Sequence, residues 1–197
     1  MTKSNSRESQ YSIDPLFLER WSPRAFTGEV IDESELLTIL DAAHWAPSSA
    51  NQQPWRFIYA LKGSEDWDKF VGLLVESNQE WAKNASALIY VVSRGFSGDF
   101  SEGKKSYTHS FDAGTAWGYL ALQARLSGFY AHGMGGIKHE EIQQTFAIPE
   151  GYRVEAGVAL GRLADKSVLS ERNQEREVPS QRKPLSEVAF RGKFIAN

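Results

Sequence analysis

The chain contains no cysteine among its 197 residues. Disulfide bonds, thiolate metal sites and cysteine nucleophiles are therefore excluded. It also carries little net charge, with a formal value of −3 at pH 7. Its overall charge therefore does not favour nucleic acid or an anionic membrane surface as a partner.

Long hydrophobic runs are missing as well. No apolar stretch reaches the roughly 18 residues that a membrane-spanning helix needs. Residues 1–10 are polar and lack the apolar core of a signal peptide. We therefore expect a cytoplasmic protein that binds neither a membrane nor nucleic acid.

The composition is that of an ordinary globular domain, with 41% hydrophobic and 24% charged residues. These proportions argue against wholesale disorder, and the length suits a single hydrophobic core. We expect a flexible N-terminal tail over residues 1–12 and one domain over residues 13–197.

Helical and strand patterns alternate in irregular order along the chain. Asp32 precedes an amphipathic stretch that Pro47 ends, and Glu35 stands where an approximate capping box places it. Asp14 and Pro15 are typical of a helix start. Further helices are expected over residues 13–20, 64–78, 107–127 and 139–146, strands over 55–61, 87–92 and 152–163, and a glycine-rich turn over 131–136. This order predicts an α+β fold with three layers around a small, mostly antiparallel sheet.

The last thirty or so residues are polar and partly basic, yet they end in four large apolar side chains. A disordered tail does not normally carry such residues. We expect Val188, Phe190, Phe194 and Ile195 to pack on the body of the protein or on a partner subunit.

Two basic segments could bind a phosphate group. Arg20 and Arg24 stand four residues apart with Ser22 between them, and Arg182-Lys183 lies near the C-terminus. Arginine presents a planar fork of donors to phosphate oxygens, and a serine hydroxyl adds one more. Taken alone, each segment is as well explained by solvated basic residues at the surface.

Two further segments are suited to a flat ligand. The run from Ala46 to Trp55 places hydroxyl and amide side chains between two prolines. The Gly133-Met134-Gly135-Gly136 segment offers exposed backbone N–H groups. Its spacing matches neither a phosphate-binding loop nor a dinucleotide fingerprint. A plain polar loop and a glycine-rich turn remain the alternatives.

No side chain is singled out for covalent or metal-assisted catalysis. The four histidines, His44, His109, His132 and His139, show no recognised metal spacing with carboxylates. Ser48 and Ser49 lack the glycine context of a hydrolase nucleophile. We therefore expect no metal and no catalytic side chain.

Together, in this order and spacing, the segments resemble the nitroreductase family of FMN enzymes over nearly the whole chain. The most specific part is the run from Pro47 to Trp55, which is PSSANQQPW. The opening Arg-x-Ser-x-Arg and the closing Arg-Lys-Pro-Leu support it. The resemblance implies a nitroreductase-like α/β/α fold, a homodimer with FMN at the subunit interface, and a C-terminal tail that packs on the partner.

The resemblance also implies which residues bind FMN. Arg20, Ser22, Arg24 and Arg182 would hold the phosphate, with Trp21 beside them and Lys183 as an addition. Pro47, Ser48, Ser49 and Asn51 would reach the flavin of the other subunit. Asn78 would contact the ribityl chain, and Gly135 and Gly136 would donate backbone hydrogen bonds near N5 and O4.

This chain departs from the family pattern in two places. Some members have a lysine near the pyrimidine edge of the flavin where the alignment puts Trp81, with Lys83 close by in the sequence. A related pattern has a second basic residue where this chain has Ser180. The source of positive charge around the flavin is therefore open.

The resemblance implies hydride transfer from NADH or NADPH through FMN to a nitroaromatic, quinone or similar acceptor. One shared pocket would give ping-pong kinetics. Residues 93–111, with Phe96, Phe100, Tyr107 and Phe111, are a candidate lid that selects substrates. The alternatives are another reaction on the same fold, such as dehalogenation, desaturation or flavin breakdown, and a flavin-binding protein without turnover.

Overall fold

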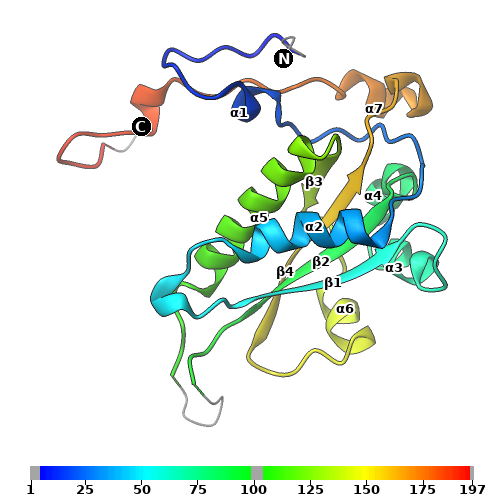
Figure 1. Ribbon diagram of the computed structural model, residues 1–197, viewed down its shortest axis with the longest axis horizontal. Coiled ribbons are helices and arrows are strands. Elements are labelled where there is room, and N and C mark those ends of the chain that lie inside the picture. Colours follow the sequence, from blue (N-terminus) through cyan, green and yellow to red (C-terminus); the bar gives the residue numbers. More distant parts are fainter. Residues whose placement is uncertain (1–4, 99–103, 196–197) are drawn as a thin grey trace.

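The computed structural model describes residues 5–98 and 104–195, and its centre is a four-stranded sheet (Figure 1). The strands lie in the order β1-β2-β4-β3, and every neighbouring pair is antiparallel. The strands are β1 (Trp55–Leu61), β2 (Ala87–Arg94), β3 (Tyr130–Met134) and β4 (Tyr152–Gly161). The α+β class and the antiparallel sheet are confirmed.

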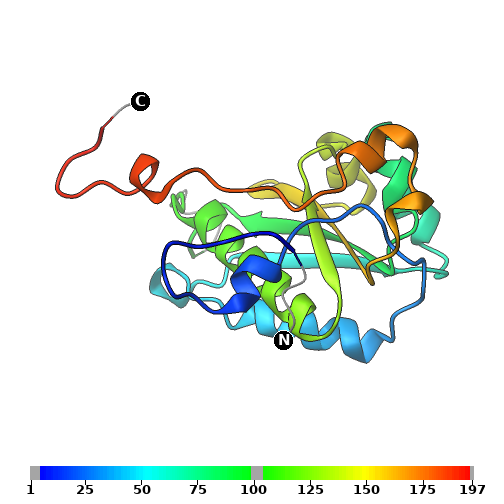
Figure 2. The same cartoon turned by 90° about the horizontal axis from the view of Figure 1, so that it is seen from above.

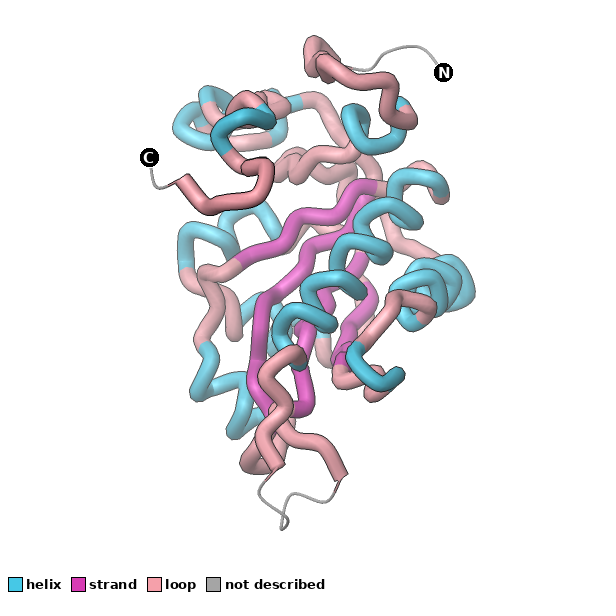
Figure 3. The backbone as a smooth tube through the Cα atoms, turned by 90° about the vertical axis from the view of Figure 1, so that its left-hand side faces the viewer, coloured by secondary structure: helices cyan, strands magenta, loops and turns pink. Residues whose placement is uncertain are grey.

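Helices cover both faces of this sheet, so the fold has three layers (Figure 3). Successive side chains of a strand point to opposite faces. In β2, Ile89 and Val91 therefore meet one helix layer, while Leu88 and Tyr90 meet the other. The first layer contains α2 (Glu33–His44) and α5 (His109–Leu126), and the second contains α3 (Trp67–Gly72), α4 (Glu76–Ala82) and α6 (His139–Thr145). Burial on both faces explains why β2 is apolar without alternation.

The termini lie outside these layers. The chain begins with an extended segment and α1 (Pro15–Glu19), where Asp14 accepts a hydrogen bond from the backbone N–H of Leu16 at 2.8 Å, as expected for an N-cap. After β4 come η3 (Lys166–Val168), α7 (Glu171–Glu175) and η4 (Leu185–Glu187). The last segment extends away from the sheet (Figure 2), and Phe194 is 83% exposed.

Three predictions of local structure are wrong. The expected helix over residues 64–78 is two short helices, because Leu74 and Ile137 form a β-bridge and Val75 N–H donates to Gly136 O at 3.1 Å between them. The expected turn over 131–136 is mostly β3, which pairs with β4 along the edge of the sheet. Asp32 makes no side-chain capping bond to α2, so the capping box is not formed.

None of the helices within residues 5–98 and 104–195 is long and apolar enough to cross a membrane. The longest of them, α5, is followed by Gly128 with φ of 80°. A residue with a side chain adopts that angle only under strain, so glycine suits the end of this helix.

Candidate functional site

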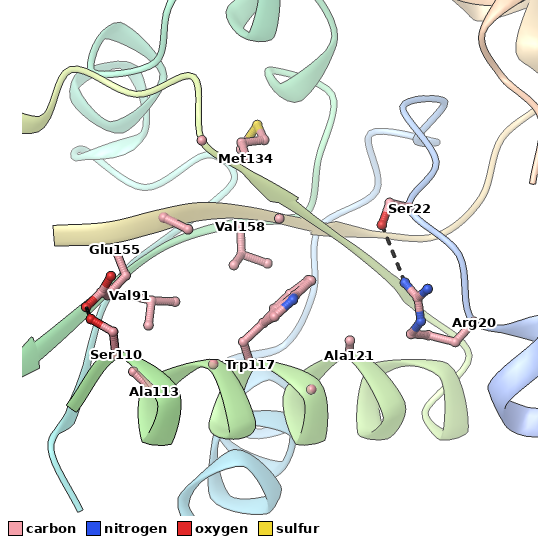
Figure 4. A pocket seen from close by; sticks show the side chains of 15 residues that line it. Arg20, Ser22, Val91, Ser110, Ala113, Trp117, Ala121, Met134, Glu155 and Val158 are labelled. Carbon is pink, nitrogen blue, oxygen red and sulfur yellow. Dashed lines mark hydrogen bonds between the residues drawn. The ribbon is translucent and has the colours of Figure 1, made fainter. Parts of the chain in front are cut away.

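A cavity of about 500 Å³ lies between α5 and the edge of the sheet formed by β3 and β4 (Figure 4). The helix contributes small residues and Trp117, and the sheet contributes Val158 together with the glycine segment at the end of β3. Arg20 and Ser22 close one end, and Glu155 and Ser110 lie at the other (Figure 4).

Small residues leave the walls of this cavity flat. The lining includes Gly114 and Gly118 of α5 and Gly135 after β3. A Cβ atom added to any of these three glycines would meet nothing within 4 Å. The absent side chains therefore leave open space into which a planar ligand can fit against exposed backbone.

Arg7 and Arg182 lie near Arg20, which lines one end of the cavity, and they themselves line a second pocket. Burial, and then repulsion from Arg182, lowers the pKa of Arg20. Burial lowers the pKa of Arg7 too, with further repulsion from Arg182 and Arg20. Among the described residues, no carboxylate lies within ion-pair distance of these three guanidinium groups. Uncompensated like charges destabilise the free protein, and such a group is typical of an anion-binding site.

Hydrogen bonds from Arg7, in the N-terminal segment, join this cluster to the C-terminal segment. Its Nε donates to Ser180 O at 2.8 Å, and its Nη1 donates to Arg20 O at 2.7 Å. The Arg20 side chain in turn approaches Ser22 Oγ at 3.4 Å (Figure 4). Nothing in the polar pattern of residues 1–12 pointed to Arg7, so this contributor was missed from the sequence.

Arg24, the second arginine of the opening motif, belongs to a different cluster. The buried Glu177 carboxylate accepts hydrogen bonds from the backbone N–H groups of Arg24 and Ala25 at 2.7 and 2.8 Å. The Arg24 guanidinium lies 3.9 Å from the same carboxylate. Trp21 is buried too, with its ring edge-on to Tyr130 at 6.3 Å, so its indole packs in the core.

Residues 18–162 match the nitroreductase family. The chain belongs to that family. A crystal structure described as an oxidoreductase containing FMN is 59% identical, covers 100% of both chains and superimposes with a TM-score of 0.96.

Two further relatives are similar to this chain. A 15.4 kDa protein of Mycolicibacterium smegmatis with no stated function is 34% identical over 151 residues, or 71% of this chain and 97% of that one. Bacillus subtilis YdgI, which is named as an NAD(P)H nitroreductase, is 27% identical over 176 residues and covers 72% of this chain and 83% of its own. The protein is thus a nitroreductase-family oxidoreductase.

The structure brings two of the predicted flavin-binding residues together. Asn78 Nδ2 donates to Gly136 O at 3.0 Å. A Cβ atom on Gly136 would lie 2.7 Å from that nitrogen, so only glycine allows this approach. The bond holds the end of α4 against the glycine segment, whose next residue upstream, Gly135, lines the cavity.

The predicted segment Pro47, Ser48, Ser49 and Asn51 lies elsewhere and does not line the cavity of its own chain. The φ values of Ala50, Asn51 and Gln53 are 49°, 54° and 47°. Residues other than glycine adopt such positive φ values at a cost in conformational energy. Two bonds hold this shape: Ser48 Oγ accepts from Gln53 N–H at 3.0 Å, and Asp112 Oδ2 accepts from Ser49 N–H at 3.2 Å. Strain of this kind is concentrated at functional sites.

Trp81, which stands where some family members have lysine, is buried and packs against His132 with ring centroids 4.7 Å apart and ring planes tilted by 35°. His132 Nδ1 lies 2.8 Å from Pro23 O. Burial above all, with repulsion from Arg24 and Arg176, lowers the pKa of His132 to about 4. This aromatic pair brings no positive charge at neutral pH, and Lys83 is exposed and does not line the cavity.

Two remaining predictions concern a metal and a lid. Within the described ranges, no group of three or more His, Cys, Asp or Glu residues could hold a metal ion. In the candidate lid, Phe96 and Lys105 form a bridge, while Tyr107 and Phe111 are 92% and 77% exposed. Phe100 lies outside the described residues. The lid stays a prediction.

Proposed function

We propose that the protein is an FMN-dependent oxidoreductase that passes hydride from NADH or NADPH through FMN to nitroaromatic, quinone or similar acceptors. The main support is Arg20, which lines one end of a flat, largely apolar cavity and lies close enough to Arg7 and Arg182 for their charges to repel. FMN combines an anionic phosphate with a planar ring system, and these two parts match the two ends of that arrangement.

The donor groups around the cavity indicate which residues of this chain would bind each part of FMN. In this proposal Arg20, Ser22 and Arg182 hold the phosphate, and Arg7 positions them. Bound FMN supplies the electron-transfer chemistry, so the protein need only hold the ring, expose one face and place donors along its edge. The complete predicted binding set is Arg20, Trp21, Ser22, Arg24, Pro47, Ser48, Ser49, Asn51, Asn78, Gly135, Gly136 and Arg182.

The proposal includes a homodimer with FMN at the subunit interface. The run from Pro47 to Asn51 is strained and held in place, but it does not line the cavity of its own chain. A second copy would bring this run to the first copy's cavity. Exposed apolar side chains in the C-terminal segment, including Val188 and Phe194, would then pack on the partner subunit.

The decisive experiment is a visible absorption spectrum of the purified protein, followed by anaerobic addition of NADH or NADPH. We expect a bound flavin that either nicotinamide bleaches and that a quinone or nitroaromatic restores. Parallel double-reciprocal plots would establish that both substrates use one pocket in turn.

Each failure has its own meaning. A colourless protein that binds no added FMN would refute the proposal. Flavin that neither nicotinamide reduces would leave a flavin-binding protein without turnover. Bleaching by nicotinamide without reoxidation by quinones or nitroaromatics would point to another reaction on the same fold.

A further inference from the structure

A β-bulge turns one carboxylate into the cavity. Val91 of β2 pairs with Ala156 of β4, but the next residue, Val92, pairs with Val154, so Glu155 is an extra residue without a partner. Val154 lies in the core on the α3, α4 and α6 face, whereas Glu155 and Ala156 both line the cavity. Strict alternation would place Glu155 on the face away from α5. Bulges next to active sites commonly re-aim a side chain in this way.

Hydroxyl groups hold the Glu155 carboxylate. Ser93 Oγ donates to Glu155 Oε1 at 2.5 Å, and Ser110 Oγ donates to the same oxygen at 2.7 Å. The other carboxylate oxygen lies 3.3 Å from Nε of Arg153, whose side chain is largely exposed. Ser93 is completely buried at the end of β2, so its hydroxyl has little freedom to find other partners.

His109 extends this network toward the surface. Its Nδ1 lies 2.7 Å from Ser93 Oγ. Because the single hydroxyl proton of Ser93 goes to Glu155, Nδ1 must carry a proton and donate it to Ser93. The far edge of the imidazole faces Gly95, and 19% of the His109 side chain is exposed. A continuous chain of hydrogen bonds therefore runs from a partly exposed imidazole to the cavity.

Glu155 lies where it can exchange a proton with a ligand in the cavity. It lies at the end of the cavity opposite Arg20 (Figure 4). Met134, the last residue of β3, pairs with Gly157, so the antiparallel register brings Glu155 beside the glycine segment that follows β3. A ligand anchored by its phosphate at the arginine cluster would extend toward this carboxylate.

Acceptor reduction needs a proton that hydride does not supply. Reducing a quinone to a hydroquinone takes up two electrons and forms two O–H bonds. NADH or NADPH provides both electrons and one hydrogen nucleus as hydride and leaves as the oxidised nicotinamide. The second hydrogen nucleus must therefore enter the cavity as a proton from solvent.

We propose that Glu155 delivers this proton and that Ser93 and His109 connect Glu155 to solvent. This rests on the proposed function. His109 takes up a proton from solvent at Nε2, its Nδ1 proton moves to Ser93, and the Ser93 hydroxyl proton moves to the Glu155 carboxylate. The Glu155 carboxyl then gives this proton to the acceptor oxygen, and exchange with solvent between the two ring nitrogens resets His109.

The matched variants are Ser93→Ala and Ser110→Ala. Each removes one hydroxyl bond to Glu155 Oε1, but Ser93 Oγ lies 2.7 Å from His109 Nδ1 whereas Ser110 Oγ lies 3.5 Å from it, so the first variant removes the much shorter link to His109. A role limited to holding the carboxylate would make the two variants alike. Glu155→Gln removes the exchanging group itself while keeping its size.

Stopped-flow absorbance would follow reoxidation of the reduced holoenzyme by benzoquinone, in H2O and in D2O. General acid catalysis is worth about 10²–10⁴-fold, so Ser93→Ala and Glu155→Gln should slow this step about tenfold or more, and Ser110→Ala by at most about threefold. Added acetic acid should restore the rate of Glu155→Gln as its concentration rises. Reduction by NADPH and the FMN dissociation constant should stay near wild type in all three variants.

A second measurement does not depend on turnover. Long-range ¹H–¹⁵N NMR spectra of the protein report which nitrogen of His109 carries the proton, and we expect Nδ1. A proton on Nε2 alone would overturn the proposed direction of the chain. Equal slowing in Ser93→Ala and Ser110→Ala, or no slowing in Glu155→Gln, would overturn the relay. A wild-type protein that binds no FMN would instead refute the function on which the relay rests.

Discussion

Removing Arg20 should weaken FMN binding without affecting riboflavin, which has the same ring but no phosphate. Arg20 lines the cavity at its cationic end, and the nearby Arg182 adds repulsion that an anion would relieve. A hydrogen bond to a charged group contributes about 1.5–3 kcal/mol. Arg20→Ala should therefore raise the dissociation constant of FMN by roughly 10- to 150-fold.

Flavin fluorescence titrations of the apoprotein measure both constants directly. Arg172→Ala is the matched control, because Arg172 is exposed on α7 and does not line the cavity. Raising the salt concentration should weaken FMN binding and leave riboflavin binding nearly unchanged, since screening acts on the phosphate contacts. If Arg20→Ala weakened both flavins equally, Arg20 would be acting on the ring or on folding, and the placement of the phosphate would be wrong.

Four other predictions concern stability, FMN affinity and specificity. Because the pKa of His132 is about 4 in the folded protein and 6.5 in its unperturbed state, only the unfolded chain takes up this proton between those values. Lowering the pH from 6.5 to 4 should thus lower the free energy of unfolding by roughly 3 kcal/mol, and urea denaturation of His132→Phe should lack this contribution. A methyl group on Gly161 would lie 2.7 Å from the buried Phe26 ring, so Gly161→Ala should destabilise by about 1–3 kcal/mol; a change in the urea midpoint too small to measure would contradict that. Gly135→Ala has open space and should keep its stability but lose FMN affinity in fluorescence titrations; unchanged affinity would mean that the flavin lies elsewhere. Grafting another loop over residues 95–107 should reorder kcat/KM among acceptors without changing FMN affinity, and an unchanged order would refute the lid.

Local pattern was enough to place most elements. The helix after Asp32 and the strand β1 follow from amphipathic spacing and branched or aromatic content, and Gly128 follows from the need for a positive φ at a helix end. These features depend on neighbours in the sequence, so periodicity and turn chemistry predict them.

Predictions failed where segments far apart in the sequence form backbone hydrogen bonds with each other. The expected helix over residues 64–78 is interrupted because Leu74 and Val75 bond to the glycine segment more than sixty residues away. That segment was expected to be a turn, since β3 is short, and Gly133 within it and the two glycines after it weaken any strand pattern. Its pairing with β4 along the sheet edge is what makes it a strand.

From the residues alone, then, came the fold class, the family and the candidate binding segments, because these are carried by short runs with their own chemistry. Only the folded chain brought Arg7 from the N-terminal segment to Arg20, and only the bulge in β4 turned Glu155 toward the cavity. Both depend on contacts between segments far apart in the chain, and the free energy of such contacts cannot be read from any local sequence pattern.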